Sequence, residues 1–401
     1  MRPAPQVVVS SMGIVSAIGL NAAENLDSLR QARSGIRPLS LIPSAHQGKL
    51  LAGEVLLAND ALYQALDIPE KEAYTRTALL ALLAMQEAMA GIDLGDGRRT
   101  GLISATTVGG MDATERYYDD YLVSPVHRHF IPTHPCGHFT EQIAARYGIR
   151  DYVTTISTAC SSAANAIMLG ARMVKAGLLD RAIVGGADSL SKFTINGFNS
   201  LMIYSDVHCT PFDEHRKGLN LGEGAALLVL ESESVASELG RVPLGYVTGY
   251  GNANDAFHQT ASSDDGEGAF LAMQAALGVA GLPASAIDYV NAHGTATPNN
   301  DLSEGKALVQ LFGSRDAVPK FSSTKAFTGH TLAAAGAIEA VYSLLALAEQ
   351  AVLPNLNYTT PIAELGIVPE TEWQPAAIRH VLSNSLGFGG NCSTLVFSKH
   401  S

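Results

Sequence analysis

The sequence predicts an α/β fold in which strands are joined by covering helices. Short β-branched or apolar runs alternate with longer helix-like runs along the chain. Of the 401 residues, 47% are hydrophobic and 16% are charged. An average soluble domain has roughly 25% charged residues, so this composition indicates a large buried core. At about 150 residues per domain, the length allows two to three domains.

Apolar runs of strand length occur eight times, and runs of helix length occur four times. The strands are predicted at residues 7–10, 100–105, 182–185, 225–230, 246–250, 289–291, 381–385 and 393–397. The helices are predicted at residues 77–90, 161–176, 266–280 and 332–349.

Two similar halves are predicted, at residues 1–239 and 240–401. In each half a strand ends in a turn, at residues 183–189 and 289–295, and a glycine-rich strand pair lies near the end of the half. No low-complexity linker separates the halves, so we expect them to pack tightly. The active site is expected where the carboxyl ends of their strands meet.

Composition argues against several classes of function. Lys and Arg number 26 against 38 Asp and Glu, a formal net charge of −12, so no global positive field attracts nucleic acid. The longest charge-free run, residues 152–171, is too polar for a bilayer, and no transmembrane segment is expected. The first residues superficially resemble a signal peptide, but their serine pair and spaced glycines favour a strand and a turn. The surplus of small apolar residues indicates a subunit interface.

The cysteines are predicted to be free thiols, because they are few and widely spaced. This favours a reducing compartment, the cytoplasm. Cys160 lies where a strand-like run meets the helix predicted at 161–176. The positive end of a helix lowers a thiol pKa, and its free amides can hold an oxyanion. A catalytic nucleophile and a buried structural cysteine both fit this position.

Two histidines lie in glycine-containing loops of the second predicted half. His293 follows a predicted strand, and His330 precedes the last predicted helix. Each alone fits a structural role, but together with Cys160 they indicate a catalytic group. Lys325 is expected either to pair with Glu339 or another carboxylate, or to be a solvated charge.

Two further segments are candidates for function. Phe388 lies in a glycine-rich turn, which suits a hairpin or a mobile lid. A histidine-rich segment could be a zinc or copper site, but its spacing matches no standard finger, and a packing or docking role is favoured. Its members are His127, His129, His134, Cys136 and His138.

Together these motifs resemble the β-ketoacyl-acyl carrier protein synthases of the elongating, decarboxylating type, in the thiolase superfamily. The resemblance runs nearly end to end, through VVVSSMGIVSAIGLN, STACSSAANAI, PFDEHRKGLNLGEGAA, NAHGTATPNND, SSTKAFTGHTLAAAGAIEA and SNSLGFGGN. It implies a thiolase-like fold, in which two duplicated halves form a five-layer α-β-α-β-α sandwich.

The resemblance implies a role for each matching residue. Cys160 matches the acyl-accepting nucleophile, His293 and His330 match the two catalytic histidines, Lys325 matches the active-site lysine, and Phe388 matches the gating phenylalanine. Chain-length-factor subunits lack the cysteine, so the complete Cys-His-His set favours an enzyme. The implied supporting positions are Asp301, Glu304 and Asn391, the acyl-pocket residue Val108, and a monovalent-cation site at Asn291, Glu339, Ser383 and Asn384.

The implied reaction is a decarboxylative Claisen condensation. An acyl group passes from the phosphopantetheine of a carrier protein to Cys160, and the amides of Cys160 and Phe388 hold the oxyanion. Malonyl-carrier then binds with its thioester carbonyl between His293 and His330, which stabilise the enolate as carbon dioxide leaves. No cofactor is implied beyond the carrier-bound substrates.

The chain departs from the family in two places. It reads MIYSDVHCTPFD at residues 202–213, where elongating synthases usually have an arginine and a longer loop, and GLN where GFV is more usual. The segments that correspond to the family's docking face contain Lys71, Arg76 and Arg128.

Three functions remain open at this point. The first is chain elongation in fatty acid or type II polyketide or polyene synthesis. The second is a subunit of a ketosynthase/chain-length-factor heterodimer, and the third is a noncatalytic partner that shapes another synthase's pocket. The expected partners are an acyl carrier protein and a second ketosynthase chain, as a homodimer or a heterodimer.

Overall fold

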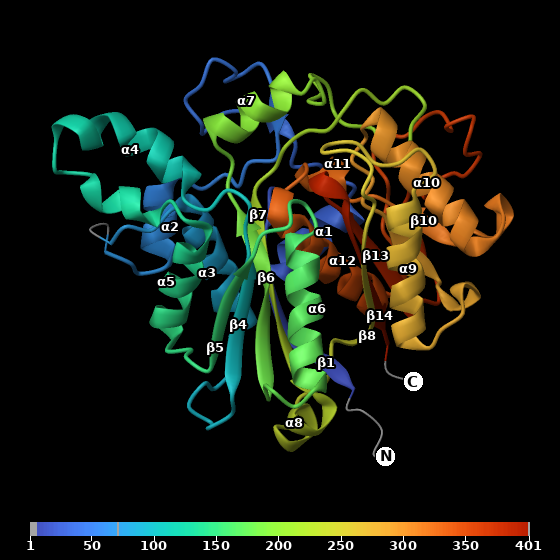
Figure 1. The fold of residues 1–401 in the computed structure, drawn as a ribbon, viewed down its shortest axis with the longest axis horizontal. Coiled ribbons are helices and arrows are strands. Elements are labelled where there is room, and N and C mark those ends of the chain that lie inside the picture. Colours follow the sequence, from blue (N-terminus) through green and yellow to red (C-terminus); the bar gives the residue numbers. More distant parts are fainter. Residues whose placement is uncertain (1–5, 70–71, 400–401) are drawn as a thin grey trace.

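A single large sheet runs through the structure, a computed structural model that describes residues 6–69 and 72–399. Its ten strands have the order β10-β9-β13-β14-β8-β1-β7-β6-β4-β5 (Figure 1). They are β1 (Val7–Val15), β4 (Thr100–Ala105), β5 (Tyr152–Ile156), β6 (Arg181–Asp188), β7 (Gly224–Ser232), β8 (Gly245–Asn254), β9 (Tyr289–Asn291), β10 (Lys320–Ser322), β13 (His380–Leu386) and β14 (Asn391–Ser398). All eight predicted strands are present, and β5 and β10 are strands that the sequence prediction missed.

The strand order repeats in the two halves of the sheet. From the middle outwards, the first half reads β1, β7, β6, β4, β5 and the second reads β8, β14, β13, β9, β10. In each half the three outer strands are parallel, and the next strand is antiparallel to both of its neighbours. The halves join where β1 pairs with β8, at Val8–Tyr246 and Val9–Gly245. The boundary between residues 239 and 240 stays a prediction.

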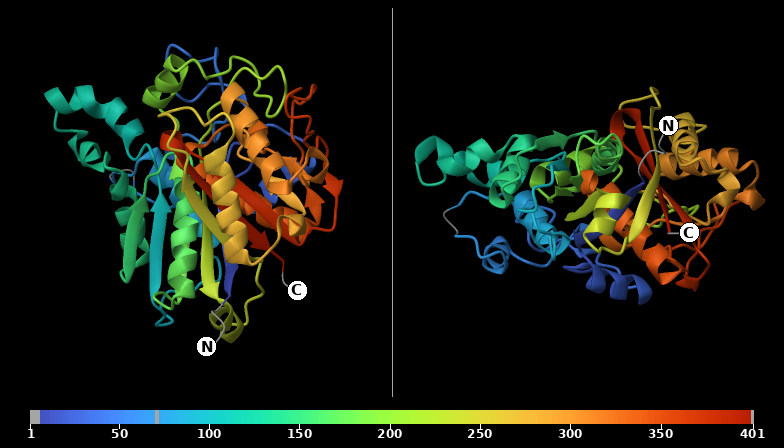
Figure 2. Two further views of the ribbon diagram at one scale, coloured as in Figure 1. Left: turned by 45° about the vertical axis from the view of Figure 1, so that its right-hand side comes forward. Right: turned by 90° about the horizontal axis from the view of Figure 1, so that it is seen from below.

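Helices form three layers around the two half-sheets. In the middle layer, α6 (Ser162–Lys175) and α12 (Ala335–Glu349) pack on each other and contact strands of both halves. The first half is covered by α3 (Arg76–Ala88) and α5 (Cys136–Tyr147), and the second by α9 (Glu267–Ala280) and α10 (Pro298–Phe312). Figure 2 shows α9 lying along β8. The layers therefore form the α-β-α-β-α sandwich that the resemblance implied.

Shorter elements complete the chain. The remaining helices are α1 (Ala22–Arg30), α2 (Asn59–Ala65), α4 (Met111–Val123), α7 (Lys192–Ser200), α8 (Glu233–Glu238) and α11 (Lys325–Thr328). The 3₁₀ turns are η1 (Arg128–Thr133), η2 (Ala284–Ala286), η3 (Arg315–Ala317), η4 (Leu332–Ala334) and η5 (Phe388–Gly390). Two small sheets pair β2 (Arg37–Pro38) with β3 (Leu51–Ala52), and β11 (Ala351–Val352) with β12 (Gln374–Pro375).

Among the described residues, the largest apolar cluster lies in the middle layer. This cluster includes α6, α12 and the inward faces of both half-sheets, and two further clusters lie beneath α3 and α9. The segment Leu332–Glu349 is long and apolar enough to cross a bilayer, but 89% of it is buried inside the fold. Its hydropathy is therefore that of a central core helix.

Gly336→Ala should destabilise the fold, because α6 and α12 approach closely at this residue. A β-carbon on Gly336 would lie 2.8 Å from Ser385 Oγ and 2.9 Å from the backbone nitrogen of Ala164. Overpacking of this kind costs roughly 1–3 kcal/mol, so the urea midpoint should fall. The control is Gly278→Ala in α9, where nothing lies within 4 Å and alanine should stabilise the helix. Equal midpoints for the two variants would contradict the close approach.

Candidate active site

Four loops bring the candidate catalytic residues together, and each loop leaves the carboxyl end of a strand. Cys160 follows β5, His293 follows β9, Lys325 follows β10, and Phe388 follows β13. β5 belongs to the first half of the sheet, and the other three strands belong to the second. The site therefore lies where the carboxyl ends of the two half-sheets meet.

A sharp turn presents Cys160 at the start of α6. Ala159 has a φ of +53°, a left-handed conformation that residues other than glycine seldom adopt, and α6 begins at Ser162. The backbone N–H of Phe388 hydrogen-bonds the thiol, of which little is exposed. A backbone donor therefore lies beside the sulfur. There it can hydrogen-bond the oxyanion that forms on the carbonyl oxygen when the sulfur attacks a thioester.

Both histidines lie beside the thiol and are almost fully buried. Nε2 of His330 is 3.0 Å from Cys160 Sγ, and the rings of His293 and His330 meet edge to face with centroids 5.3 Å apart. Among the described residues, nitrogen atoms of both rings and the sulfur lie within 4.8 Å of one another. The three side chains that the resemblance assigned to catalysis therefore converge at one point.

Lys325 fixes the protonation of His293, and a backbone amide fixes that of His330. Nζ of Lys325 lies 3.1 Å from Nδ1 of His293 and forms an ion pair with Glu339, so Nδ1 accepts a hydrogen bond from the ammonium group. Nδ1 of His330 accepts the backbone N–H of Leu332 at 3.2 Å. With each Nδ1 accepting, each neutral ring carries its proton on Nε2.

These protons make the two histidines hydrogen-bond donors and not metal ligands. Their spacing from Cys160 could hold a metal ion. A ligating imidazole nitrogen must be unprotonated, whereas Nε2 of His293 and of His330 each carry a proton. The cluster instead offers two N–H groups that can stabilise negative charge on a substrate oxygen.

Burial dominates the ionisation of the site. It lowers the pKa of His293 and of His330 well below 6.5, and the charge of Lys325 acts in the same direction. Burial also raises the pKa of Cys160 to about 11, against the opposing effects of Lys325 and the Phe388 N–H. The prediction of a lowered thiol pKa at the helix N-terminus is therefore wrong for this closed site, because the loss of hydration outweighs the helix dipole.

Acidification should destabilise the fold through His293 and His330. Below pH 6.5 the unfolded chain protonates both residues and the folded chain does not, so their contribution is full above this pH and is lost as the pH falls. The free energy of unfolding should decrease by about 1.4 kcal/mol per pH unit for each histidine. Urea unfolding between about pH 7.5 and 5.5 measures this slope. A double variant, His293→Gln with His330→Gln, should show a shallower slope, and an unchanged slope would refute the assignment.

Two buried carboxylates of α10 hold the loop that carries His293. Glu304 accepts the backbone N–H groups of His293 and Gly294, each at 2.8 Å. Asp301 accepts the N–H of Ala296 at 3.1 Å. The sequence left open whether Asp301 and Glu304 belong to the site or only to a helix N-terminus, and these contacts make them supports of the His293 loop.

Asn391 links the glycine-rich turn to the nucleophile helix. Its Oδ1 accepts hydrogen bonds from Ser161 Oγ at 2.7 Å and from the side-chain amides of Asn165 and Asn252, both at 2.9 Å. Its backbone carbonyl accepts the N–H of the residue before Phe388 at 2.9 Å. Asn391 therefore holds the Phe388 amide in its place beside the sulfur.

Asn391→Ala should slow acylation of Cys160 by roughly tenfold, because it removes the side-chain oxygen that joins Ser161 and Asn165, at the start of the nucleophile helix, to the turn of Phe388. Asn391→Asp keeps an oxygen that accepts the same donors, so it should recover most of the rate. Stopped reactions analysed by intact-protein mass spectrometry measure the acylation rate, and thermal unfolding measures stability. If both variants acylate as fast as wild type, Asn391 has no positioning role.

A cavity of about 350 Å³ leads to the catalytic cluster. Phe198 of α7 and Phe388 both line it, and their rings stack with centroids 5.8 Å apart. Val108 is not among the lining residues; it packs in an apolar cluster with Leu219, which does line the cavity. The role of Val108 in setting acyl length stays a prediction.

The histidine-rich segment packs against α4 and forms no metal-like group in the part of the chain that the structure describes. His127 stacks on Tyr117 and pairs with Asp120, and His134 hydrogen-bonds Thr114 at 2.9 Å. The local contacts fit the packing role that the sequence favoured.

The three residues suggested for docking differ in their positions. Arg76 is buried in an ion pair with Glu223, so it cannot contact a carrier protein, and this expectation is corrected. The segment of Arg76 corresponds to the family's docking face, but here its guanidinium points into the fold and bonds Glu223 and the carbonyl of Val55. Arg128 is exposed over the ring of Tyr121, and Lys71 lies outside the described residues.

Comparison with known families decides the identity of the fold. The family model described as "Beta-ketoacyl synthase, N-terminal domain" matches residues 4–236, and "Beta-ketoacyl synthase, C-terminal domain" matches residues 244–359. The chain belongs to the beta-ketoacyl synthase family. Over an alignment of 412 residues it is 35% identical to "3-oxoacyl-[acyl-carrier-protein] synthase 2" of Staphylococcus aureus (strain N315). The alignment covers 98% of each chain.

Two solved structures show how far this ketosynthase resembles its relatives. One is titled "The ishigamide ketosynthase/chain length factor"; it has a TM-score of 0.92 and 28% identity and covers 100% of both chains. Another is a type II polyketide synthase acyl-carrier protein in complex with its ketosynthase bound to the hexaketide. It has a TM-score of 0.87 and 25% identity, and the alignment covers 99% of this chain and 100% of that one.

Sequence reasoning missed Asp188, which holds two backbone segments next to the ketosynthase site. This buried carboxylate at the end of β6 accepts hydrogen bonds from Thr107 N–H, Val108 N–H and Ala333 N–H. It ties the loop of Val108 to η4, close to His330. An acidic residue at the end of an otherwise apolar strand was the available signal.

Proposed function

We propose that this ketosynthase condenses a Cys160-bound acyl group with malonyl-acyl carrier protein to give 3-oxoacyl-acyl carrier protein. One observation carries the proposal: a nitrogen of His293 and of His330 lies within 4.8 Å of the Cys160 sulfur, and the Nδ1 of each ring is taken up by a donor, which leaves Nε2–H as the donor of each histidine. A nucleophile with two neutral donors suits a reaction that forms an oxyanion and then an enolate.

The first half-reaction is transfer of the acyl group to Cys160. The Cys160 thiol gives up its proton as its sulfur attacks the carrier thioester carbon. The new carbon–sulfur bond forms, the carbon–sulfur bond to phosphopantetheine breaks, and the phosphopantetheine thiolate leaves and takes up the proton that the Cys160 thiol lost. The N–H groups of Phe388 and Cys160 stabilise the tetrahedral oxyanion. His330 already carries its proton on Nε2, so it acts here as a donor and not as the base.

The second half-reaction is decarboxylation and carbon–carbon bond formation. The malonyl thioester oxygen accepts from Nε2–H of His293 and of His330, and loss of carbon dioxide leaves an enolate held by these two donors. The enolate carbon attacks the acyl-cysteine carbonyl, and the Cys160 thiolate leaves and is reprotonated. Lys325 keeps Nδ1 of His293 unprotonated throughout, which holds the donor on Nε2.

A noncatalytic, pocket-shaping role is not favoured, because all three catalytic side chains are present and in contact. A heterodimer is the second candidate assembly, since the structure with a TM-score of 0.92 is titled as a ketosynthase/chain-length-factor pair. We place the protein in the cytoplasm, which fits its four free cysteines.

A monovalent cation fits beside Lys325, in the network of Asn291 and Glu339. Oδ1 of Asn291 and Oε2 of Glu339 are buried without a hydrogen-bond partner among the described residues. Oxygen donors of this kind suit a hard cation. Ser383 is a neighbour in β13, and the side chain of Asn384 is already bonded to Glu304 and Thr394. A higher melting temperature in potassium chloride than in tetramethylammonium chloride supports the site, and equal temperatures would exclude it.

Product analysis tests the proposed function. The purified protein is incubated with acyl-carrier and malonyl-carrier proteins, with and without a candidate chain-length-factor subunit, and released carbon dioxide and 3-oxoacyl-carrier are quantified. Product from the isolated chain establishes a self-sufficient synthase. Product only with the partner establishes the heterodimer, and no condensation in either case rejects the proposal.

A further inference from the structure

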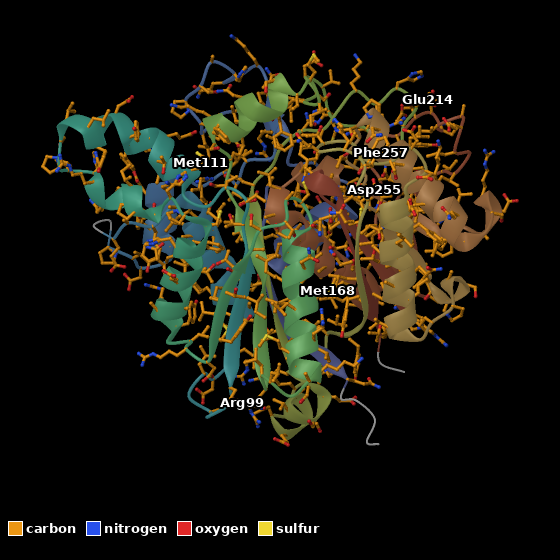
Figure 3. All side chains as sticks on the ribbon, viewed as in Figure 1. Arg99, Met111, Met168, Glu214, Asp255 and Phe257 are labelled. Carbon is orange, nitrogen blue, oxygen red and sulfur yellow. The ribbon has the colours of Figure 1, made fainter. Side chains whose placement is uncertain are left out.

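A buried carboxylate lies against the turn that follows His330. Asp188 ends β6, and five donor groups of the described chain hydrogen-bond its two oxygens. Four of them belong to the loop after β4, and they are the hydroxyl groups of Thr106 and Thr107 and the backbone N–H groups of Thr107 and Val108. The fifth is the N–H of Ala333 in η4, at 2.8 Å. In Figure 3, Met111 marks where α4 begins just after this loop, near the upper end of the sheet.

These neighbours stabilise the ionised form of Asp188. Three of the donors are backbone N–H groups, which can only donate, and they contact both carboxylate oxygens. Burial raises the pKa of this carboxyl group, and the hydrogen bonds from Thr106, Thr107, Ala333 and Val108 oppose the rise. An asparagine at this position would turn an amide N–H2 group toward at least one of the N–H donors, and that donor would lose its partner.

The turn between His330 and Ala333 sets which nitrogen of His330 carries the ring proton. Leu332 has a φ of +54°, a left-handed conformation that persists in a residue other than glycine only where contacts hold it. In this conformation the Leu332 N–H donates to Nδ1 of His330 at 3.2 Å, which leaves the proton on Nε2, 3.0 Å from Cys160 Sγ. The next N–H along the chain, that of Ala333, is the one that donates to Asp188.

The carboxylate joins this turn to the other half of the sheet. His330 follows β10 in the second half, whereas Asp188 and the loop of Val108 follow β6 and β4, which pair with each other in the first half. Val108 and Leu332 also pack in one apolar cluster. The turn is therefore held by a part of the fold that does not itself carry the histidine.

We propose that Asp188 is a positioning residue that keeps the ring proton of His330 on Nε2. Its bond to Ala333 holds the turn in the left-handed form, so the Leu332 N–H stays on Nδ1. Without this bond the turn relaxes and releases Nδ1. The Cys160 thiol then donates to Nε2, and the ring proton moves to Nδ1. The inference rests on the proposed function for one consequence: a ring in this second form offers no Nε2–H to the malonyl thioester oxygen.

Asp188→Asn tests the proposal, and Glu231→Gln is its matched control. Glu231 is a buried carboxylate of β7 that pairs with Arg181 and Arg241. The register of β6 and β7 places it at the opposite end of this strand pair from Asp188. Both variants remove a buried charge from the same two strands and should lower the melting temperature, but only Asp188→Asn alters a contact of η4. Asp188→Ala is a second test variant, because it turns no N–H2 group toward the donors.

Two readouts separate positioning from stability. The first is the ¹⁵N spectrum of substrate-free protein labelled at histidine, in which His330→Gln identifies the His330 signals. Wild type and Glu231→Gln should show the proton on Nε2, and both Asp188 variants should show a second population with the proton on Nδ1. The second readout is carbon dioxide release from malonyl-carrier protein divided by the rate of Cys160 acylation. The Asp188 variants should lower this ratio by about tenfold or more, and Glu231→Gln should leave it within about twofold.

Three results would overturn the proposal. A wild-type spectrum with the proton of His330 on Nδ1 does so without any variant. Asp188 variants that match Glu231→Gln in both readouts show that Asp188 supports only the fold. A change in one readout without the other breaks the link between the ring proton and decarboxylation. If wild type neither acylates Cys160 nor releases carbon dioxide, the proposed function itself fails, while the spectra of the substrate-free proteins still decide the role of Asp188.

Discussion

Cys160→Ala should abolish acyl transfer and condensation, by at least about 10⁴-fold in rate. Cys392 also lines the cavity, but its thiol hydrogen-bonds the carbonyl of Gly390 and does not group with the two histidines as Cys160 does, so it should not replace Cys160. The same variant should still release carbon dioxide from malonyl-carrier protein, since both enolate-stabilising donors remain. Radiolabelled acyl transfer and carbon dioxide release measure the two activities separately.

Cys136→Ala is the matched control for this prediction. Cys136 is a free, partly exposed cysteine that does not line the catalytic cavity. Its loss should leave both activities intact. Acylation that persists in Cys160→Ala, or that disappears only in Cys136→Ala, would show that the nucleophile has been misassigned.

His293→Ala and His330→Ala should each reduce decarboxylation by about 10²–10³-fold. Each removes one Nε2–H donor from the malonyl thioester oxygen. Acylation of Cys160 should fall much less, because the Phe388 and Cys160 amides stabilise its oxyanion. Carbon dioxide release and intact-protein mass after acyl transfer report the two steps.

His380→Ala serves as the histidine control, because His380 hydrogen-bonds Ser398 at 2.8 Å and lies outside the cavity. It should retain both activities. Equal losses of acylation and decarboxylation in His293→Ala or His330→Ala would contradict the separation of roles. Full decarboxylation in both variants would remove the enolate mechanism.

Hydrophobic periodicity was sufficient to predict the central elements of the fold. The long apolar runs that form β7 and α12 are buried except at the carboxyl end of each element, so their patterns were unambiguous. β10 was missed because only one of its three residues, KFS, is apolar, whereas the equally short β9 reads YVN. β5 was missed because its sequence YVTTI lies at the sheet edge and is only partly buried. α10 begins with the polar run PNNDLSEG, whose apolar face appears only late in the helix.

The site was predictable as a set of residues but not as a geometry. An ion pair with Glu339 was one of the alternatives for Lys325, beside another carboxylate or a solvated charge, and the structure contains this ion pair. Its contact with Nδ1 of His293 could not be predicted, because β9 and β10 bring the two loops together only in the folded sheet. The raised thiol pKa was missed because a helix N-terminus can be read from sequence, whereas the dehydration of the cavity around it cannot.

The most direct measurement is the mass of the peptide that contains Cys160 after the protein has been incubated with acyl-carrier protein alone. We expect an acyl adduct on Cys160, its disappearance when malonyl-carrier protein is added, and no adduct in Cys160→Ala. An adduct on another residue, or an unmodified Cys160 with every acyl group tried, would contradict the central claim that this thiol carries the growing chain.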